Sequence, residues 1–323
     1  GLGNCWVSKQ VLRQLIGRRL FELYDPKSRR VAGPLGTQTM PLWDLAGKVL
    51  RRPVYDLLGG AGPERVGVYD GSIYFADLLP QYAARWQDRF KEEIDESIKR
   101  GHRAVKVKIG RGAKWMDRAA GDRRDVEVVR LIRRHAGKDF LIGVDANNGY
   151  DLAGAKRFLD RAGAEDLAFV EEMFPEQVDR CLELKRFIAD RGWKTLLADG
   201  ETQTVLVGLR AGVRAKAVDV LQGDMNRFGM EGIMDEAAMG KPQGIQVAPH
   251  NWGSLVGFTM QLHVGRAITN FYRAEQDPLS SDLLVADGYK IAGGTCSVPG
   301  ASGFGLAIDH RRFRDAKILF DLK

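Results

Sequence analysis

The stretch AVKVKIG, residues 104–110, alternates apolar residues with two lysines, Lys106 and Lys108. Residues two apart in a β-strand lie on the same face, so this pattern predicts a strand with one apolar face and one face that carries two ammonium groups. Two neighbouring cations disfavour each other's charge, which can leave one lysine as a base near neutral pH. A solvent-exposed edge strand is the alternative explanation of the same pattern.

Similar apolar segments recur along the chain, and stretches with helical periodicity separate them. The eight predicted strands end at Asp70, Ile109, Asp145, Glu172, Glu201, Asp224, His250 and Glu275. Strands that alternate with amphipathic helices are typical of a parallel sheet with helical crossovers, and eight such units predict an α/β fold, a (β/α)8 barrel of the TIM type. A doubly wound open sheet is the alternative, but the first strand lacks the Gly-x-Gly-x-x-Gly turn typical of many such folds.

The composition narrows the class of protein and its partners. The chain has 323 residues, of which 44% are hydrophobic and 28% charged, as in ordinary soluble globular proteins. The basic residues behind the net charge of +7 are dispersed, so we expect no nucleic-acid partner. No apolar run has the length of a membrane span, so we expect no membrane partner. The widely spaced Cys5, Cys181 and Cys296 indicate a reducing compartment, the cytoplasm, without disulfides.

The sequence character changes twice along the chain and predicts three regions. Residues 1–62 are polar and helical, and they contain too few strands for a domain of their own. Residues 63–275 carry the alternating pattern and form the predicted barrel. Residues 276–323 are rich in glycine and proline, and we expect an irregular segment that packs back on the N-terminal region.

Helical periodicity predicts several elements around the barrel strands. Residues 11–24 are expected to form one helix, and residues 41–60 two helices separated at Pro53. Within the barrel, residues 111–124 are expected to form a long loop before a helix that starts at Asp125.

Polar side chains stand at or next to the ends of seven consecutive predicted strands. They are Lys106 and Lys108, Asp145 with Asn147, Glu171, Glu201, Asp224, His250 and Glu275. The carboxyl ends of the strands of a (β/α)8 barrel meet at one rim, where active sites lie. Each residue alone would be explained as a turn former, a helix cap or a solvated charge. Their recurrence at successive strands instead indicates one shared site.

Three carboxylates on three consecutive strands, Asp145, Glu171 and Glu201, offer the oxygen ligands that Mg²⁺ prefers. A set rich in histidine or cysteine would have indicated zinc. A lysine on the second strand and His250 on the seventh flank this set, and Asp224 is placed to orient the imidazole. A metal with a base on either side fits the removal of a proton next to a carboxylate.

Short motifs surround these residues, namely KVK at residues 106–108, DAN at 145–147, EE at 171–172, GE at 200–201, QGD at 222–224, APH at 248–250 and FYRAE at 271–275. Together they resemble the enolase superfamily, specifically its mandelate racemase branch. WDLAGK with PVYDLLGG shortly after it is similar to the end of the capping domain of that family, and VPGASGFG is similar to its C-terminal return segment. The resemblance covers nearly the whole chain.

The resemblance implies roles for the residues of the site. Asp145, Glu171 and Glu201 would bind Mg²⁺. Lys108 would be one general base, with Lys106 supporting it and the substrate carboxylate; His250, oriented by Asp224, would be the other acid or base; Glu275 would hydrogen-bond an enediolate oxygen. The substrate would be a small-molecule carboxylate, and the protein would form a homo-oligomer.

Two neighbouring carboxylates compete for the metal. Met173 follows the glutamate pair where the family usually has proline, so Glu172 is an alternative ligand to Glu171. Asp199 directly precedes Gly200 and Glu201 and is the second alternative.

Polar side chains that follow strand ends are expected to face the barrel mouth: Asn147, Asn148, Asn226, Arg227 and Asn251. Buried donors and acceptors are costly unless paired, and a polyhydroxylated acid would pair them. The favoured function is therefore the dehydration of a sugar acid to a 2-keto-3-deoxy acid by a lyase, with Asn147, Arg227 and Asn251 in contact with substrate. The alternatives are a racemase or epimerase of a 2-hydroxy acid or related carboxylate, and a non-catalytic ligand-binding relative.

Capping domains of this family begin with a small antiparallel sheet whose loops close over the barrel mouth. No such sheet is recognisable in the sequence from Gly1 onward. If Gly1 is the true terminus, we expect the mouth to be open to solvent and activity to be low for want of water exclusion.

Overall fold

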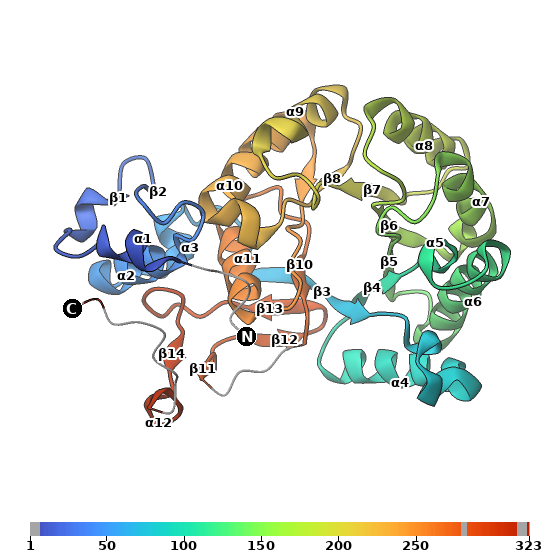
Figure 1. Ribbon diagram of the computed structural model, residues 1–323, viewed down its shortest axis with the longest axis horizontal. Coiled ribbons are helices and arrows are strands. Elements are labelled where there is room, and N and C mark those ends of the chain that lie inside the picture. The colour runs from blue at the N-terminus through green and yellow to red at the C-terminus, as the bar shows by residue number, and fades with distance from the viewer. Residues whose placement is uncertain (1–6, 279–282, 315–321, 323) are drawn as a thin grey trace.

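Parallel strands form a closed barrel in the computed structural model, which describes residues 7–278, 283–314 and 322. The barrel strands are β3 (Arg65–Ile73), β4 (Ala104–Lys108), β5 (Leu141–Asp145), β6 (Leu167–Glu171), β7 (Leu196–Asp199), β8 (Val220–Leu221), β9 (Gln246–Val247) and β10 (Ala274–Gln276). Each strand from β3 to β8 pairs with the next in chain order, and β10 pairs with β3 (Figure 1). A parallel bridge between Val247 and Phe271 joins β9 to the segment that leads into β10. The predicted (β/α)8 barrel is confirmed.

Helices cover the outside of the barrel, as the periodicity predicts (Figure 1). They are α4 (Trp86–Lys99), α6 (Arg118–Ala136), α7 (Leu152–Ala162), α8 (Val178–Asp190), α9 (Leu206–Ala215), α10 (Met225–Gly240) and α11 (Leu255–Ala267). Four of them begin after a residue whose side chain accepts a backbone N–H of the first turn, namely Asp117, Asp151, Asp224 and Ser254. Each such N-cap stabilises its helix by about 1 kcal/mol.

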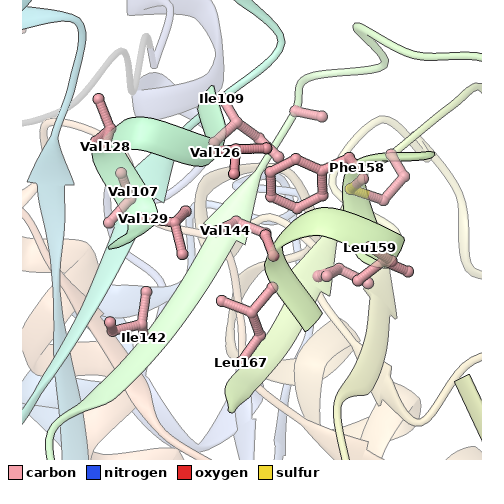
Figure 2. Close-up of a cluster of buried hydrophobic side chains, with 14 of the residues drawn as sticks. Val107, Ile109, Val126, Val128, Val129, Ile142, Val144, Phe158, Leu159 and Leu167 are labelled. Carbon is pink, nitrogen blue, oxygen red and sulfur yellow. The ribbon is translucent and has the colours of Figure 1, made fainter. Parts of the chain in front are cut away.

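The two faces of β4 divide as the alternation predicts. Val105 and Val107 are fully buried in the core between the strands and the outer helices. Figure 2 shows this core, in which Val107 of β4 and Val144 of β5 lie near Val129 of α6. Lys106 lies on the other face of β4, together with Ala104. Ala104 belongs to a second apolar cluster, which is made of residues from several barrel strands. The lysines therefore point into the barrel rather than to an exposed sheet edge.

The N-terminal region differs in part from its predicted helices. The helix predicted over residues 11–24 is wrong: α1 (Lys9–Arg13) is short, and a 3-10 turn (Leu20–Glu22) and a small hairpin of β1 (Tyr24–Asp25) and β2 (Arg30–Val31) follow. Gly17 interrupts the helical pattern with a φ of 79°, a conformation that L-residues with a side chain avoid. The second predicted pair is present as α2 (Met40–Leu50) and α3 (Val54–Leu57), with Pro53 directly before α3.

The long loop predicted over residues 111–124 is also wrong. Most of it is helical, because α5 (Arg111–Lys114) is followed by α6 from Arg118 onward. Asp117 starts α6 early by accepting the backbone N–H of Ala120 at 3.1 Å. The predicted start of this helix at Asp125 came from its apolar periodicity, which becomes visible only after the charged first two turns.

The C-terminal segment contains more regular structure than its glycine and proline content indicates. β12 (Lys290–Ala292) and β13 (Thr295–Ser297) form a hairpin, and β13 pairs antiparallel with β3 of the barrel. β11 (Leu284–Val285) pairs with β14 (Ala307–Ile308), and the short α12 (His310–Phe313) follows. The segment thus extends the barrel sheet, which the sequence did not predict.

The same segment contacts the N-terminal region. The backbone N–H of Val54 donates to the carbonyl of Gly303 at 2.9 Å, and the N–H of Phe304 donates to the side chain of Asp44 at 2.9 Å. Gly47 is required here, because a Cβ at this position would lie 2.5 Å from Cα of Gly303.

Among the described residues, no helix is both long enough and apolar enough to cross a bilayer. Cys181 and Cys296 are buried free thiols, and Cys5 lies outside the described residues. The described cysteines thus agree with the predicted lack of disulfides.

His263 on α11 joins three parts of the chain inside the core. Its Nδ1 accepts the backbone N–H of Tyr55 at 3.0 Å, and its Nε2 lies 2.8 Å from the hydroxyl of Tyr289. That hydroxyl donates to the carbonyl of Phe304, so Nε2 must carry a proton and Nδ1 must be free of one. Burial lowers the pKa of His263 to about 3, which agrees with a neutral ring.

Mild acid is expected to destabilise the protein through His263. The folded pKa of about 3 lies below the ordinary value of 6.5, so the unfolded chain binds a proton first as the pH falls. The stability that His263 confers is complete above pH 6.5 and decreases below it, by about 2 kcal/mol between pH 7 and pH 5. Urea unfolding at the two pH values should show that His263→Gln is less stable at pH 7 but loses about 2 kcal/mol less than wild type on acidification.

The control for this measurement is His135→Gln, on the partly exposed face of α6. This variant should keep nearly the full pH dependence of wild type. Equal losses of stability in wild type and His263→Gln between pH 7 and pH 5 would show that His263 is not kept neutral by the fold.

Candidate active site

A cavity of about 390 Å³ lies at the carboxyl ends of the barrel strands. Its lining combines predicted site residues with aromatic ones: Gly71, Tyr74, Phe75, Lys106, Lys108, Asn147, Glu201, Arg227, His250, Trp252 and Glu275. These residues come from segments at the first, second, third, fifth, sixth, seventh and eighth strands of the barrel. The strand ends therefore bring distant parts of the sequence to one place, as the barrel geometry predicts.

Asp145, Glu171 and Glu201 meet at one edge of this cavity. Ligand oxygens of the three carboxylates lie within 4.8 Å of one another. Asp145 and Glu171 are the last residues of β5 and β6 and are paired in register, and Glu201 follows β7 by two positions. Among the described residues this is the only group of at least three acidic, histidine or cysteine side chains placed to hold a metal. Three carboxylates are a donor set suited to Mg²⁺.

The surroundings of the cluster favour a bound cation. Burial raises the pKa of Glu171, and the neighbouring carboxylates Asp145, Glu275 and Glu201 raise it further against the opposing effect of Lys106. Burial also raises the pKa of Glu201, and Glu172 adds to this effect. Negative charge on these groups is therefore costly without a cation, which a divalent ion would supply.

Lys106 is buried and held as a cation. Its Nζ lies 2.8 Å from Glu171, 2.7 Å from Glu275 and 3.5 Å from Asp145. Burial lowers its pKa, but Glu171 and Glu275 outweigh this effect, and the pKa lies well above the ordinary value. The expectation that two neighbouring lysines lower each other's pKa is thus wrong for Lys106, because carboxylates surround it.

Lys108 lies nearer the open side of the cavity. Its Nζ donates to Asp145 and, at 2.7 Å, to Oδ1 of Asn147. The side chain is 13% exposed, whereas that of Lys106 is 1% exposed, so Lys108 is the more accessible of the two lysines that line the cavity. Asn147 lines the cavity as predicted, and its amide nitrogen lies 3.3 Å from Glu172.

A buried ion network fixes the turn that follows Lys108. Arg111 is fully buried and pairs with Asp77 at 2.7 Å and with Asp125 at 2.7 Å. Its Nη1 also donates to the carbonyl of Lys108 at 3.1 Å. Asp125 accepts in addition the hydroxyl of Tyr150 at 2.6 Å, which ties the ends of β4 and β5 together. The sequence did not predict this network, because the same arginine and aspartate residues could equally form an exposed ion pair on the surface.

His250 and Asp224 face each other across a parallel bridge between the ends of two neighbouring strands. Nδ1 of His250 lies 2.7 Å from Oδ2 of Asp224, and Nε2 lies 3.2 Å from Oε2 of Glu201. Burial lowers the pKa of His250, but the hydrogen bond to Asp224 and the charges of Glu275 and Glu201 outweigh it and raise the pKa to about 9. The imidazole is therefore oriented by Asp224, with Nε2 directed towards the carboxylate cluster.

The variant Asp224→Asn is expected to lower kcat by about a hundredfold, because the imidazole of His250 loses the carboxylate that orients it and keeps it protonated. Asparagine can still cap α10, whose first-turn N–H groups donate to Oδ1 of residue 224. Since Asp224 raises the pKa of His250, its loss should lower that pKa and move the alkaline limb of the kcat–pH profile to lower pH. Asp151→Asn, at the N-cap of α7, is the matched control and should change neither value. An unchanged profile would contradict the orienting role.

Glu275 is held from two sides. One carboxylate oxygen lies 2.7 Å from Nζ of Lys106, and the other accepts the backbone N–H of Asn251 at 2.8 Å. Gly71 leaves room for this carboxylate, since a Cβ at that position would lie 2.4 Å from it. The carboxylate of Glu275 thus lines the cavity next to Lys106.

The structure places Asn251 differently from the prediction. Its side chain is buried, and the amide nitrogen donates to the carbonyl of Ser254 at 3.0 Å and to that of Glu275 at 3.3 Å. It is absent from the cavity lining within the described part of the chain. Asn251 therefore organises the loop after His250, and its predicted contact with substrate is corrected to a contact with backbone.

The two alternative metal ligands lie outside the cluster of three carboxylates. Glu172 has a φ of 41° and turns away from the strand, where it accepts from Asn147. Oδ1 of Asp199 accepts the backbone N–H of Gly200 at 2.7 Å. The geometry thus favours Glu171 and Glu201 as the ligands over their neighbours.

Aromatic residues that the sequence analysis did not select form part of the cavity wall. Tyr74 and Phe75 follow β3, and the hydroxyl of Tyr74 lies 3.2 Å from Asp277. Trp252 follows His250 by two residues and is 68% exposed. No feature of the sequence separates these three residues from ordinary loop or core aromatics.

Gln222 is a further residue that the sequence analysis overlooked. Its amide donates to Oε2 of Glu171 at 2.7 Å, while Lys106 occupies the other oxygen of the same carboxylate. Gln222 is itself buried, just beyond β8. It therefore fixes the orientation of a predicted metal ligand.

Fold and site together define a (β/α)8 barrel whose rim joins three clustered carboxylates to a lysine and to a histidine–aspartate pair. The family profile described as enolase C-terminal domain-like matches residues 89–312. The chain belongs to this family and to the mandelate racemase branch of the enolase superfamily. The resemblance found in the sequence is confirmed.

Curated relatives of the chain are sugar-acid enzymes by name. An arabinonate dehydratase of Saccharolobus solfataricus is 30% identical over 297 residues, which cover 89% of this chain and 72% of the relative. A D-galactarolactone cycloisomerase of Agrobacterium fabrum is 30% identical over 233 residues, which cover 71% of this chain and 56% of the relative. The chain thus spans little more than half of the second relative.

Solved structures give the same result. A galacturonate dehydratase from Geobacillus sp., complexed with D-galacturonate and 5-keto-4-deoxy-D-galacturonate, has a TM-score of 0.86 and 31% identity and covers 96% of this chain and 82% of its own. A mandelate racemase/muconate lactonizing protein from Geobacillus sp. Y412MC10, complexed with magnesium and tartrate, has a TM-score of 0.86 and 32% identity, with coverages of 96% and 81%. Both similarities extend over nearly the whole chain.

Proposed function

We propose that this protein is a Mg²⁺-dependent lyase that dehydrates a sugar acid to a 2-keto-3-deoxy acid. The observation that carries the proposal is the cluster of the carboxylates of Asp145, Glu171 and Glu201 beside a cavity that Glu201, Lys108 and His250 line. The named dehydratases among the relatives, which include arabinonate and galacturonate dehydratases, support this reaction class. The relative solved with magnesium and tartrate supports the metal.

Asp145, Glu171 and Glu201 would hold the metal. When bound, Mg²⁺ would attract the substrate carboxylate and stabilise the negative charge that develops on it. Lys106, which is held as a cation beside Glu171 and Glu275, would add positive charge at the same place. Such preorganised charges commonly supply the largest part of catalysis.

Lys108 and His250 would move the protons. Lys108 would remove the proton from the α-carbon, and the electrons of that C–H bond would form the enediolate. The β-carbon to oxygen bond would then break, and His250 would protonate the departing hydroxide to give water. Its raised pKa of about 9 supports this acid role, because the ring holds a proton at neutral pH. The enol product would rearrange to the 2-keto-3-deoxy acid.

Glu275 would stabilise the intermediate from a second side. It would hydrogen-bond an oxygen of the enediolate. Its position next to Lys106 and its fixed orientation through the N–H of Asn251 support this role.

A racemase or epimerase is the second candidate. Lys108 and His250 reach the cavity from the second and seventh barrel strands, an arrangement that proton transfer between two faces of an α-carbon also needs. A non-catalytic binder is less well supported, because each position that the chemistry requires is filled.

We further propose the cytoplasm as the location, a homo-oligomer as the assembly, and a division into residues 1–62, 63–275 and 276–323. The buried free thiols of Cys181 and Cys296 support a reducing compartment. Light scattering of the purified protein tests the assembly.

The experiment that tests the proposed function incubates the protein with Mg²⁺ and a panel of sugar acids. Formation of a 2-keto-3-deoxy acid, lost on chelation of the metal and restored by Mg²⁺, would support dehydration. In D₂O, recovery of the acid with the opposite α-configuration and with deuterium at the α-carbon, without formation of keto acid, would reject dehydration in favour of racemisation. No reaction and no exchange at the α-carbon of any acid would contradict both.

A further inference from the structure

The cavity has carboxylates at its floor and a guanidinium at its rim. Glu201 and Glu275, the lining carboxylates, have side chains that are only 16% and 5% exposed, and they contact His250 and Lys106. Arg227 lines the same cavity but is exposed, on the first turn of α10. The floor is thus arranged for a cation, whereas the rim offers a site for an anion.

Within the described residues, Arg227 makes no ion pair with any carboxylate, in contrast to Lys106 and Lys108. Its Nη1 donates to the backbone carbonyl of Glu201 at 2.8 Å. Its own backbone N–H is fixed by Asp224 at 2.9 Å. The guanidinium is therefore held at the rim by a neutral hydrogen-bond partner. It lies near the charge of Asp224 but, among the described residues, donates to no carboxylate, so further N–H groups can reach a ligand.

We propose that Arg227 binds a second carboxylate at the far end of the substrate, so that the preferred sugar acid is a diacid. The inference rests on the proposed function, which places the first carboxylate at the metal site on the cavity floor. A guanidinium matches a carboxylate with two parallel hydrogen bonds, whereas a terminal hydroxyl offers it one neutral acceptor. The cavity volume of about 390 Å³ lies in the range of small-molecule sites.

Matched pairs of acids that differ only at the terminal carbon test this proposal. D-glucarate is compared with D-gluconate, and galactarate with D-galactonate, under Mg²⁺. The diacid of a productive pair should have a kcat/KM about ten- to a hundredfold higher than the monoacid, the range expected for charge-assisted hydrogen bonds.

Variants then assign this preference to the guanidinium. Arg227→Gln should lower kcat/KM for the diacid far more than for the monoacid and so remove the advantage of the diacid, whereas Arg227→Lys should keep part of the advantage because it keeps the charge. Arg214→Gln, which removes an exposed arginine from α9, is the control and should leave both values unchanged.

Two outcomes would overturn the proposal: equal or better use of the monoacid by wild type, or an equal loss for both acids in Arg227→Gln. If no acid is dehydrated, the proposed function fails, and calorimetric titration of the same pairs in Mg²⁺ decides the inference alone. Tighter binding of the diacid that disappears in Arg227→Gln supports it, and equal affinities of the two acids overturn it.

Discussion

Replacement of Glu171 by glutamine is expected to lower kcat/KM by about a thousandfold or more, because a metal that stabilises the enediolate contributes several kcal/mol. Glu171 lies at the centre of the acidic cluster, where Lys106 and Gln222 hold one oxygen each. Glutamine keeps the size of the side chain but removes the charge and one ligand oxygen. Calorimetric titration should therefore show that the affinity for Mg²⁺ falls together with activity.

The fold of this variant should survive without the metal. Burial and neighbouring carboxylates raise the pKa of Glu171, so its charge is unfavourable in the metal-free protein, and an uncharged side chain is expected to be tolerated. Thermal unfolding of metal-free wild type and variant should show similar midpoints. Added Mg²⁺ should then raise the midpoint of wild type only.

The matched control is Glu172→Gln, one position further along the chain. Glu172 is also buried, but it lies outside the group of three carboxylates, and its side chain interacts with Asn147 and Glu201. This variant should keep its affinity for Mg²⁺ within about threefold of wild type, since it removes no ligand. If Glu172→Gln loses the metal while Glu171→Gln keeps it, the assignment of the two glutamates must be exchanged.

The choice between these two glutamates shows where sequence reasoning ends. The alternation of strands and helices predicts that Asp145, a glutamate of the pair and Glu201 reach one rim, because parallel strands of a barrel end together. Adjacent residues in extended chain point to opposite faces, so a shift of one residue decides between Glu171 and Glu172. The register of Asp145 with Glu171 favours Glu171, and register depends on packing that no local pattern contains.

Asn251 was misplaced for the same physical reason. It follows His250 directly, so the two side chains leave the backbone in different directions, and the amide of Asn251 finds backbone carbonyls instead of the cavity. Tyr74 and Trp252, in contrast, line the cavity without any sequence feature that separates them from ordinary loop or core aromatics. Charge patterns thus predicted the chemistry at the strand ends, while the walls of the cavity required the folded chain.

His250→Asn is expected to lower the rate of dehydration by about 10²- to 10⁴-fold while the α-proton is still removed. Burial lowers the pKa of His250, but Asp224, Glu275 and Glu201 outweigh it and raise the pKa to about 9, so this ring would hold a proton for the leaving hydroxyl in the proposed mechanism. Lys108 reaches the cavity from the second barrel strand, whereas His250 follows the seventh. Lys108 would therefore still take the α-proton in this variant. The two steps should therefore be separable.

The separation can be measured by NMR in D₂O with Mg²⁺ and an acid that wild type converts. His250→Asn should incorporate deuterium at the α-carbon without forming keto acid, because an ammonium at Lys108 that has exchanged with solvent returns a deuteron to the enediolate. Lys108→Met should show neither deuterium nor keto acid, since it removes the base of the first step. Exchange by Lys108→Met but not by His250→Asn would assign the α-proton to His250 and reverse the two roles. If wild type instead returns the acid with inverted configuration and deuterium at the α-carbon, Lys108 and His250 would be the paired bases of a racemase.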